Sequence, residues 1–313
     1  MEQVRLLLAI VLSFLVFLVW QFFFTEKKTD QPVEPTKKVE QPKEAPVKKT
    51  VIVPEKKLDI EKRLIDEKET AEEDDHKSRF IRVNTPLYSV VVSEKGAAFK
   101  SFTLQNYRKE IDKNSELFEM ISPDVNSGTV LSGFEQNSIR GLEDRVFTVD
   151  SKYDVIGVEA QKREVVFIYQ SKDGILVEKK YVFYADSYVI GMMVSIKNGS
   201  NAPIKDNIFL SLMNITSDDK RMYGFEGPSA MIGDKIEEVK PKKVKEKNIF
   251  SGDLKWVAIQ DRYFISSIIP KEPVEATMKL DIDENGVLMN RYVSNEMVIQ
   301  PGNEKLFEYE LYF

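Results

Sequence analysis

An acidic and a basic residue, Asp261 and Arg262, stand side by side in a largely apolar stretch, DLKWVAIQDRYFISSIIP (253–270). Set into a pocket, a carboxylate beside a guanidinium could bind a polar substrate or move a proton. Apolar and polar positions also alternate on both sides of the pair, which is typical of a strand that crosses a core. We favour this structural interpretation: a strand that bends or leaves the core at Gln260–Arg262, resumes as FISSIIP and ends at Pro270.

Residue counts exclude several kinds of catalysis. The chain has no cysteine and one histidine, His76, which lies in a polar segment far from the aromatic-rich region. Cysteine nucleophiles, thiolate metal sites, disulfides, histidine-ligated zinc and Ser-His-Asp catalysis are thereby excluded from that region. Gly227-Pro228-Ser229-Ala230-Met231 begins like the nucleophile elbow of hydrolases, but Met231 stands where that motif requires glycine.

Two further motifs resemble ligand sites only in part. Asp281–Gly286 reads like the start of an EF-hand calcium loop, but Tyr292 occupies the position that requires a bidentate glutamate. A hairpin turn at Asn285-Gly286 is the better interpretation. The basic run Lys240–Lys247 lacks interleaved aromatic residues and the net charge is −6, which favours a solvated loop over nucleic-acid binding.

These observations predict a protein that is not an enzyme. No pair of carboxylates stands out for glycoside chemistry among the many aspartates and glutamates. We therefore assign no catalytic, cofactor-binding or metal-binding residues and expect no cofactor. The sequence does not identify the residues that would bind a substrate or a partner.

Residues 1–24 are expected to form a transmembrane signal anchor. The run Leu6–Phe24 contains nineteen residues without a charge. As a helix it would span about 28 Å, close to the ~30 Å thickness of the hydrocarbon layer. Thr25-Glu26-Lys27 follows in place of the small residues of a cleavage site, so we expect the anchor to be retained. Arg5 favours a cytoplasmic N-terminus, although lysines on the other side of the run weaken this argument.

Residues 25–79 are expected to form a disordered linker. The segment carries five prolines in a background rich in lysine and glutamate, and it contains no Phe, Tyr or Trp. Proline disrupts helices and strands, and the segment offers too little apolar surface to offset the entropy of the chain. Part of it should adopt an extended, polyproline-like conformation that separates the following domain from the bilayer.

Residues 80–313 show the two-residue period of β-strands. In SYVIGMMVSIK, five residues from Tyr188 to Ile196 fall on one face. Turn signals recur at Glu94-Lys95-Gly96, Asn198-Gly199 and Asn285-Gly286. No sustained helical period and no alternation of strands with helices appears. We therefore predict one all-β domain, a large antiparallel β-sandwich of about fifteen or more strands.

Three stretches of this domain resemble the first periplasmic region of YidC, the bacterial membrane protein insertase. They are NTPLYSVVVSEKGAAFKSFTLQNYR (84–108), DSYVIGMMVSIKN (186–198) and WVAIQDRYFISSIIP (256–270), the last preceded by GPS (227–229). With the anchor and the charged linker, the resemblance extends over essentially the whole chain. It implies a β-supersandwich similar to sugar mutarotases, not catalytic and located in the periplasm.

The resemblance also implies partners and a location. The family acts in the bacterial inner membrane in insertion, folding and assembly of membrane proteins, so the Sec translocon and nascent membrane proteins are the expected partners. Its insertase core consists of five further transmembrane helices, whereas this sequence ends at Tyr309–Phe313. We expect the chain to be a fragment or a separately encoded front half, single-pass, and unable to insert proteins alone.

Two other functions remain open. A carbohydrate-binding envelope domain on the same sandwich would need aromatic platforms beside polar groups, which Trp256, Tyr263 and Tyr292 could supply, although positions in the core suit these residues better. The anchor and the Lys/Pro/Glu-rich linker also resemble an energy coupler of the TonB kind. Such couplers carry a much smaller C-terminal domain than residues 80–313, which disfavours this alternative.

Overall fold

A computed structural model describes residues 78–215, 224–272 and 275–313. His76, the anchor expected at 1–24 and nearly all of the linker expected at 25–79 lie outside these ranges. Within them, no helix has both the length and the apolar character needed to cross a membrane. The described residues form twenty strands and two short 3-10 helices, which confirms the prediction of a large all-β domain.

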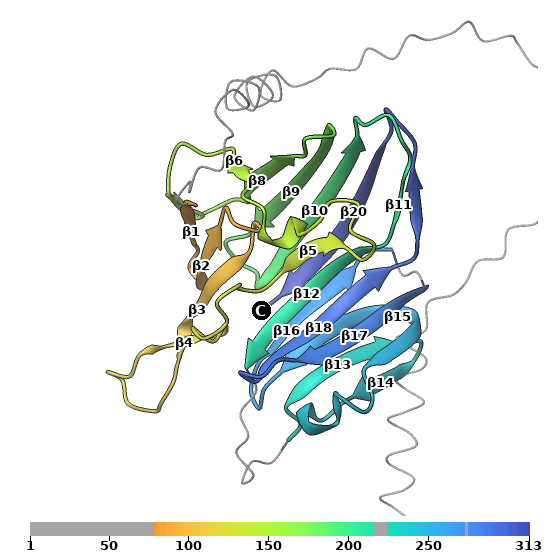
Figure 1. Ribbon diagram of the computed structural model, residues 1–313. Coiled ribbons are helices and arrows are strands. Elements are labelled where there is room, and N and C mark those ends of the chain that lie inside the picture. The colour runs from red at the N-terminus through yellow and green to blue at the C-terminus, as the bar shows by residue number, and fades with distance from the viewer. Residues whose placement is uncertain (1–77, 216–223, 273–274) are drawn as a thin grey trace, which may run out of the picture. The chain divides into compact units, whose positions relative to one another are not determined.

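The smaller of the two main sheets has five strands in the order β4-β3-β2-β1-β7 (Figure 1). Its neighbouring strands are antiparallel except β1 and β7, whose pairing is parallel. The five strands are β1 (Phe80–Asn84), β2 (Tyr88–Ser93), β3 (Phe99–Arg108), β4 (Leu117–Glu119) and β7 (Val155–Gly157).

The larger sheet has thirteen strands, eleven of them in the order β5-β12-β18-β17-β15-β16-β20-β10-β9-β8-β6 (Figure 1). Two more strands extend this sheet: β13 pairs with β15, and β14 pairs with β13. The thirteen are β5 (Leu131–Phe134), β6 (Thr148–Val149), β8 (Arg163–Gln170), β9 (Ile175–Phe183), β10 (Val189–Asn198), β12 (Ile208–Ile215), β13 (Gly227–Ile232), β14 (Lys235–Glu238), β15 (Ile249–Gln260), β16 (Ile265–Pro270), β17 (Glu275–Ile282), β18 (Val287–Ser294) and β20 (Glu304–Tyr312).

Smaller elements complete the domain. The strands β11 (Ile204–Asp206) and β19 (Met297–Ile299) form a separate two-stranded antiparallel sheet. The 3-10 helices are η2 (Leu142–Asp144) and η3 (Pro241–Lys243).

Aromatic side chains fill the space between the two main sheets. Phe99 of β3 lies with its ring centre 5.0 Å from that of Tyr181 on β9 and 5.7 Å from that of Phe313, which follows β20. Phe102 of β3 stacks on Phe313, with ring centres 4.6 Å apart. Since β3 belongs to the small sheet and β9 and β20 to the large one, these rings join two layers of a sandwich.

The strand β10 shows the predicted alternation. Ile190, Met192, Val194 and Ile196 are buried, while the residues between them are partly exposed. The strand pairs with β9 on one side and with β20 on the other, so its backbone groups are satisfied by the sheet. The period of two therefore identified both the strand and its core face correctly.

The stretch 253–270 is not one bent strand, and the prediction was wrong on this point. It forms two antiparallel strands, β15 and β16, joined by a turn at 261–264. Strand β15 also changes its partner before this turn. Its residues Ile249–Asp253 pair with β17, and its residues 257–260 pair with β16. Apolar and polar residues alternate on both sides of the turn, so the sequence pattern gives no sign that the chain reverses its direction there. The second strand ends at Pro270, as predicted.

Two of the three turn signals mark hairpins. Glu94-Lys95-Gly96 joins β2 to β3, and Asn285-Gly286 joins β17 to β18. Asn198-Gly199 does not, because it ends β10 and the next strand, β11, pairs with β19. The buried side chain of Asn198 donates to the carbonyl oxygens of Ala202 and Ile299, at 2.8 Å each. It stabilises a crossover between sheets and not a tight hairpin.

Candidate functional site

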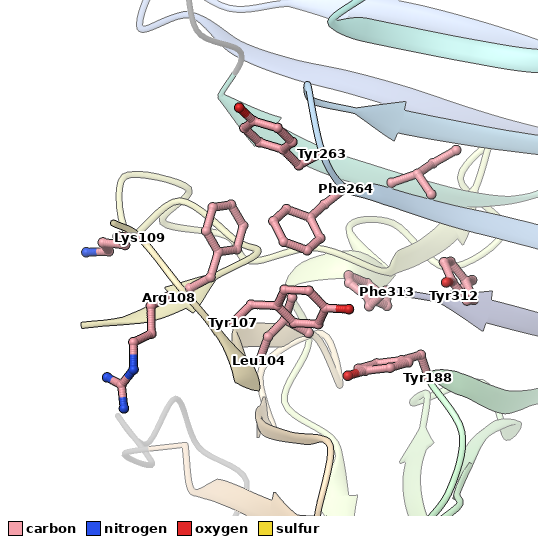
Figure 2. Close-up of a pocket in the computed structure, with 11 residues that line it drawn as sticks. Leu104, Tyr107, Arg108, Lys109, Tyr188, Tyr263, Phe264, Tyr312 and Phe313 are labelled. Carbon is pink, nitrogen blue, oxygen red and sulfur yellow. The ribbon is translucent and has the colours of Figure 1, made fainter. Parts of the chain in front are cut away.

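A cavity of about 540 Å³ opens beside the end of β3 and the turn between β15 and β16 (Figure 2). We call it the aromatic groove because most of its lining residues carry rings. Segments far apart in the sequence supply them: Leu104, Tyr107, Arg108, Lys109, Phe118, Tyr188, Tyr263, Phe264, Ile265, Tyr312 and Phe313.

One wall comes from β3, β4 and the loop between them. The backbone N–H of Lys109 donates to the carbonyl oxygen of Glu116 at 3.0 Å, and the Lys109 ammonium lies 2.6 Å from the Glu116 carboxylate. The guanidinium of Arg108 donates to the carbonyl oxygen of Ser115. These bonds close the base of the loop and fix Tyr107 at the edge of the groove.

The opposite wall comes from the turn between β15 and β16. The Asp261 carboxylate accepts the backbone N–H groups of Tyr263 and Phe264, both at 2.7 Å, as short polar side chains commonly do in turns. This places the Phe264 ring 4.3 Å from Phe118 and 5.2 Å from Tyr107, the latter edge to face at 86°. The aspartate therefore shapes the turn that carries the wall.

The floor is continuous with the core. Phe313 is 4% exposed and stacks on Phe102, which is fully buried. Phe102 in turn stacks on Tyr88, with ring centres 4.6 Å apart and 23° between the ring planes. Tyr188, the residue before β10, has its ring centre 6.3 Å from that of Tyr88. Since these rings pack within the sandwich, the floor is rigid and its shape is formed before any ligand arrives.

The rim is exposed and amphipathic. Tyr263 is 72% exposed, Tyr107 46% and Tyr312 39%. Arg108 and Lys109 lie on the same side as Tyr107, with their charged groups directed away from the rings (Figure 2). Glu116 raises the pKa of Lys109, so this ammonium stays charged at neutral pH. The groove thus offers an apolar interior bordered by hydroxyl groups and positive charge.

The lining is mainly apolar and aromatic. Among the described residues that line the groove, none has a carboxylate or imidazole side chain. Aromatic faces and the side chains of Leu104 and Ile265 offer apolar contact, and tyrosine hydroxyls offer hydrogen bonds at the edge. Elsewhere in the described ranges, no three His, Cys, Asp or Glu side chains gather as metal ligands would.

The motifs considered from the sequence have structural positions. Ser229 is buried in the middle of β13, without the sharp turn of a nucleophile elbow. The Asp281–Gly286 motif ends β17 and forms its turn into β18, as predicted. Asp261 and Arg262 are exposed at the β15–β16 turn. The interpretation of this pair as structural agrees with the hydrogen bonds of Asp261, although the element is a turn.

The three aromatic residues considered for sugar stacking do not share a surface. Tyr292 is 2% exposed and packs edge to face with Tyr309 in the core, and burial raises its pKa to about 12. Trp256 is partly buried in β15, where it pairs with Met231 of β13. Only Tyr263 lines the aromatic groove.

Sequence reasoning missed most of the groove. Tyr107, Phe118, Tyr188 and Phe313 were not singled out, since they come from four separate strand ends. No local pattern distinguishes these four residues from other aromatic residues of the strands, and none shows which strand ends meet.

The two packed sheets define a β-sandwich domain. The X-ray structure of a galactose mutarotase related enzyme from Lactobacillus acidophilus superposes with a TM-score of 0.51, covering 74% of this chain and 96% of that chain. The sequences are 9% identical, so this likeness concerns the fold alone. The sequence model of the YidC periplasmic domain matches residues 80–313, and the chain belongs to this family.

Relatives with the name "Membrane protein insertase YidC" are similar over most of the chain. The one from Syntrophus aciditrophicus is 26% identical over 239 residues, which are 75% of this chain and 44% of the relative. The one from Pelobacter propionicus is 24% identical over 314 residues, which are 98% of this chain and 55% of the relative. The chain thus spans about half the length of these relatives.

Proposed function

We propose that this chain is the periplasmic front region of a YidC-type insertase, held at the bacterial inner membrane by Leu6–Phe24. Its role is to aid the insertion, folding and assembly of membrane proteins by contact with a nascent chain or with the Sec translocon. The observation that carries the proposal is the family match over residues 80–313, together with relatives named as membrane protein insertases.

The aromatic groove is the part of the domain that we assign to the nascent chain. A membrane protein segment is apolar, and burying it against rings gains roughly 25 cal/mol for each Å² removed from water. The cavity of about 540 Å³ falls within the usual size of ligand sites and can take a few large side chains at a time. Flat rings accept many apolar shapes, which suits an insertase with diverse clients.

The contact is accessory and not catalytic. Insertion of a helix into a bilayer needs a path through the membrane, and the relatives extend about as far again beyond the part that this chain matches. We therefore place the insertase core in that additional length. In cells depleted of the insertase, this chain alone should fail to restore insertion, and restored insertion would show that the core lies within residues 1–313.

A photo-crosslinking experiment tests the groove. A photoreactive amino acid replaces Tyr263 in the full-length insertase, and a second variant carries it at Asn201, an exposed position in the segment between β10 and β11. Crosslinks to a nascent membrane protein or to a Sec component from position 263, with none from position 201, would support the proposal. Equal labelling from both positions would contradict a specific contact.

Calorimetry with peptidoglycan and glycan fragments tests the carbohydrate alternative. The aromatic rings of the groove could also stack on a sugar, although the three residues expected to form a platform do not meet. A saturable heat of binding that disappears in the Tyr263→Ala variant would show that the groove binds a glycan, and we would then assign a glycan and not a polypeptide as its ligand. Absence of heat with the wild-type chain would leave the polypeptide as the assigned ligand.

A further inference from the structure

The loop between β3 and β4, residues 109–116, carries a large apolar side chain at its tip. This β3–β4 loop extends away from the five-stranded sheet (Figure 1). Ile111 lies on it with a relative exposure of 105%, the largest among the exposed hydrophobic residues of the described ranges. A single exposed apolar side chain is common on protein surfaces, so Ile111 supports a contact only together with the exposed tyrosines of the same region.

Hydrogen bonds hold the loop in a defined shape. Its ends are joined by the Lys109–Glu116 ion pair and by the bond from Arg108 to the Ser115 carbonyl oxygen. Near the tip, the Asp112 carboxylate accepts the backbone N–H of Asn114 at 2.8 Å. Ile111 is therefore presented on a braced loop.

Exposed tyrosines border the aromatic groove next to the loop. Tyr107 lies in β3 two residues before the loop, Tyr263 belongs to the opposite wall, and Tyr312 lies at the other end of the groove from Lys109 (Figure 2). All three are at least 39% exposed. Tyrosine rings, long cationic side chains and an isolated aliphatic residue are the groups that favour the headgroup region of a bilayer, where one end of a side chain is dry and the other is wet.

We propose that the β3–β4 loop and the rim tyrosines dock on the surface of a lipid bilayer, with Ile111 at the boundary between headgroups and acyl chains. This inference goes beyond the proposed function and rests only on the part of it that anchors the chain through Leu6–Phe24. Because a tether keeps the domain at a high local concentration near the bilayer, a weak contact is sufficient. Docking would turn the mouth of the groove toward the membrane, where apolar segments enter or leave it.

Charge on the loop indicates what kind of contact this is. Lys109 and Lys113 are offset by Glu110, Asp112 and Glu116. The loop therefore has no excess positive charge to attract anionic lipid. The contact should depend on Ile111 and the tyrosines, and it should change little when anionic lipid is added to a zwitterionic bilayer.

The absence of cysteine allows a direct test on the full chain. Asn114→Cys carries a fluorophore beside Ile111, and Asn201→Cys carries the same fluorophore in the exposed segment between β10 and β11. That segment lies on the opposite side of the domain from the β3–β4 loop (Figure 1). Each labelled chain is reconstituted into phosphatidylcholine vesicles that contain a lipid-attached quencher, with and without phosphatidylglycerol. Resistance to alkaline extraction verifies the anchor separately.

The proposal predicts strong quenching at position 114 and little at position 201, in both kinds of vesicle. The substitution Ile111→Asp in the Asn114→Cys chain should reduce quenching to the level at position 201, because it replaces the only apolar side chain of the loop by a charged one. Equal quenching at both positions, or quenching unaffected by Ile111→Asp, would overturn the proposal. Quenching at 114 that requires phosphatidylglycerol would also overturn it, in favour of a purely electrostatic contact. The vesicles contain no client and no translocon, so failure here leaves the proposed insertase role intact.

Discussion

The rings of Phe118 and Phe264 lie 4.3 Å apart, and they join the edge strand β4 of the small sheet to the β15–β16 turn of the large sheet. About 145 residues separate the two in the sequence. This contact closes one side of the aromatic groove, so the width of the groove depends on the packing of these two rings between the layers of the sandwich.

Replacing Phe264 by alanine should open this side of the groove and destabilise the domain. The ring contacts both Phe118 and Tyr107, so its loss should lower the free energy of unfolding by about 1–3 kcal/mol. Urea denaturation measures the change. The adjacent Tyr263→Ala serves as control, since Tyr263 is 72% exposed and its loss should cost less than about 0.5 kcal/mol. Equal effects would show that Phe264 does not join the layers.

Asp261→Ala should loosen the turn without touching the core. The carboxylate accepts two backbone N–H groups at 2.7 Å, and their loss should lower the free energy of unfolding by about 1 kcal/mol and reduce crosslinking from position 263. Asp261→Asn keeps an oxygen acceptor and should retain most of both properties. If Asn and Ala behave alike in thermal unfolding and in crosslinking, the side chain of Asp261 does not shape the turn.

Gly96→Ala should be far more harmful than alanine at another glycine of similar backbone conformation. Gly96 has a φ of 69° and a Cβ there would overlap the carbonyl oxygen of Glu143, whereas Gly302 has a φ of 79° and open space around it. Gly302→Ala should cost about 1–2 kcal/mol from the left-handed conformation alone. Gly96→Ala should cost about 3 kcal/mol or more, because the backbone must also shift. Thermal unfolding of the two variants compares them, and similar losses would contradict the close approach.

Stability should rise with pH between about 7.5 and 9.5 because of Lys179. Burial lowers the pKa of this lysine to about 7 against the opposing effect of Glu143, while in the unfolded chain its pKa is 10.5. Between these values the unfolded chain binds more protons than the folded one. The free energy of unfolding should therefore increase by about 1 kcal/mol per pH unit in this window.

Denaturation of Lys179→Met at pH 7.5, 8.5 and 9.5 checks this linkage. The variant should lose most of the slope, and Lys180→Met, whose side chain points away from the core, should keep it. Below pH 7 the slope that Lys179 causes disappears, since both states are then protonated and the folded state carries the full cost of the buried charge. Above pH 10 the buried tyrosines act in the opposite direction, because burial raises the pKa of Tyr292 and Tyr181. A flat profile in the wild type would contradict a neutral Lys179.

Local patterns in the sequence predicted the β class of the domain and a few of its strands. Alternation gave the core face of β10, and the Gly96 and Gly286 turns gave two hairpins, because a β-strand repeats every two residues and a tight turn needs a left-handed residue. The same patterns failed at Asn198-Gly199 and at 261–264. After Asn198-Gly199 the next strand pairs in another sheet, and such a partner leaves no mark on the local sequence. At 261–264 the next strand pairs directly with β15, but the turn Asp261–Phe264 contains neither the glycine nor the asparagine that marks a tight hairpin.

Lys179 illustrates the difference between what the local sequence determines and what the tertiary structure determines. Its alternation with Val177 and Tyr181 places it on the core face of β9, and this is a property of the strand alone. What it meets there is the carbonyl oxygen of Gly96, 2.7 Å away and 83 residues earlier in the chain. The sequence by itself determined the composition of the segments, the β class of the domain and the faces of its strands, because these depend on neighbours a few residues away. Only the tertiary structure brought four strand ends and a turn together as the aromatic groove, because the packing of one sheet on another decides which distant side chains meet.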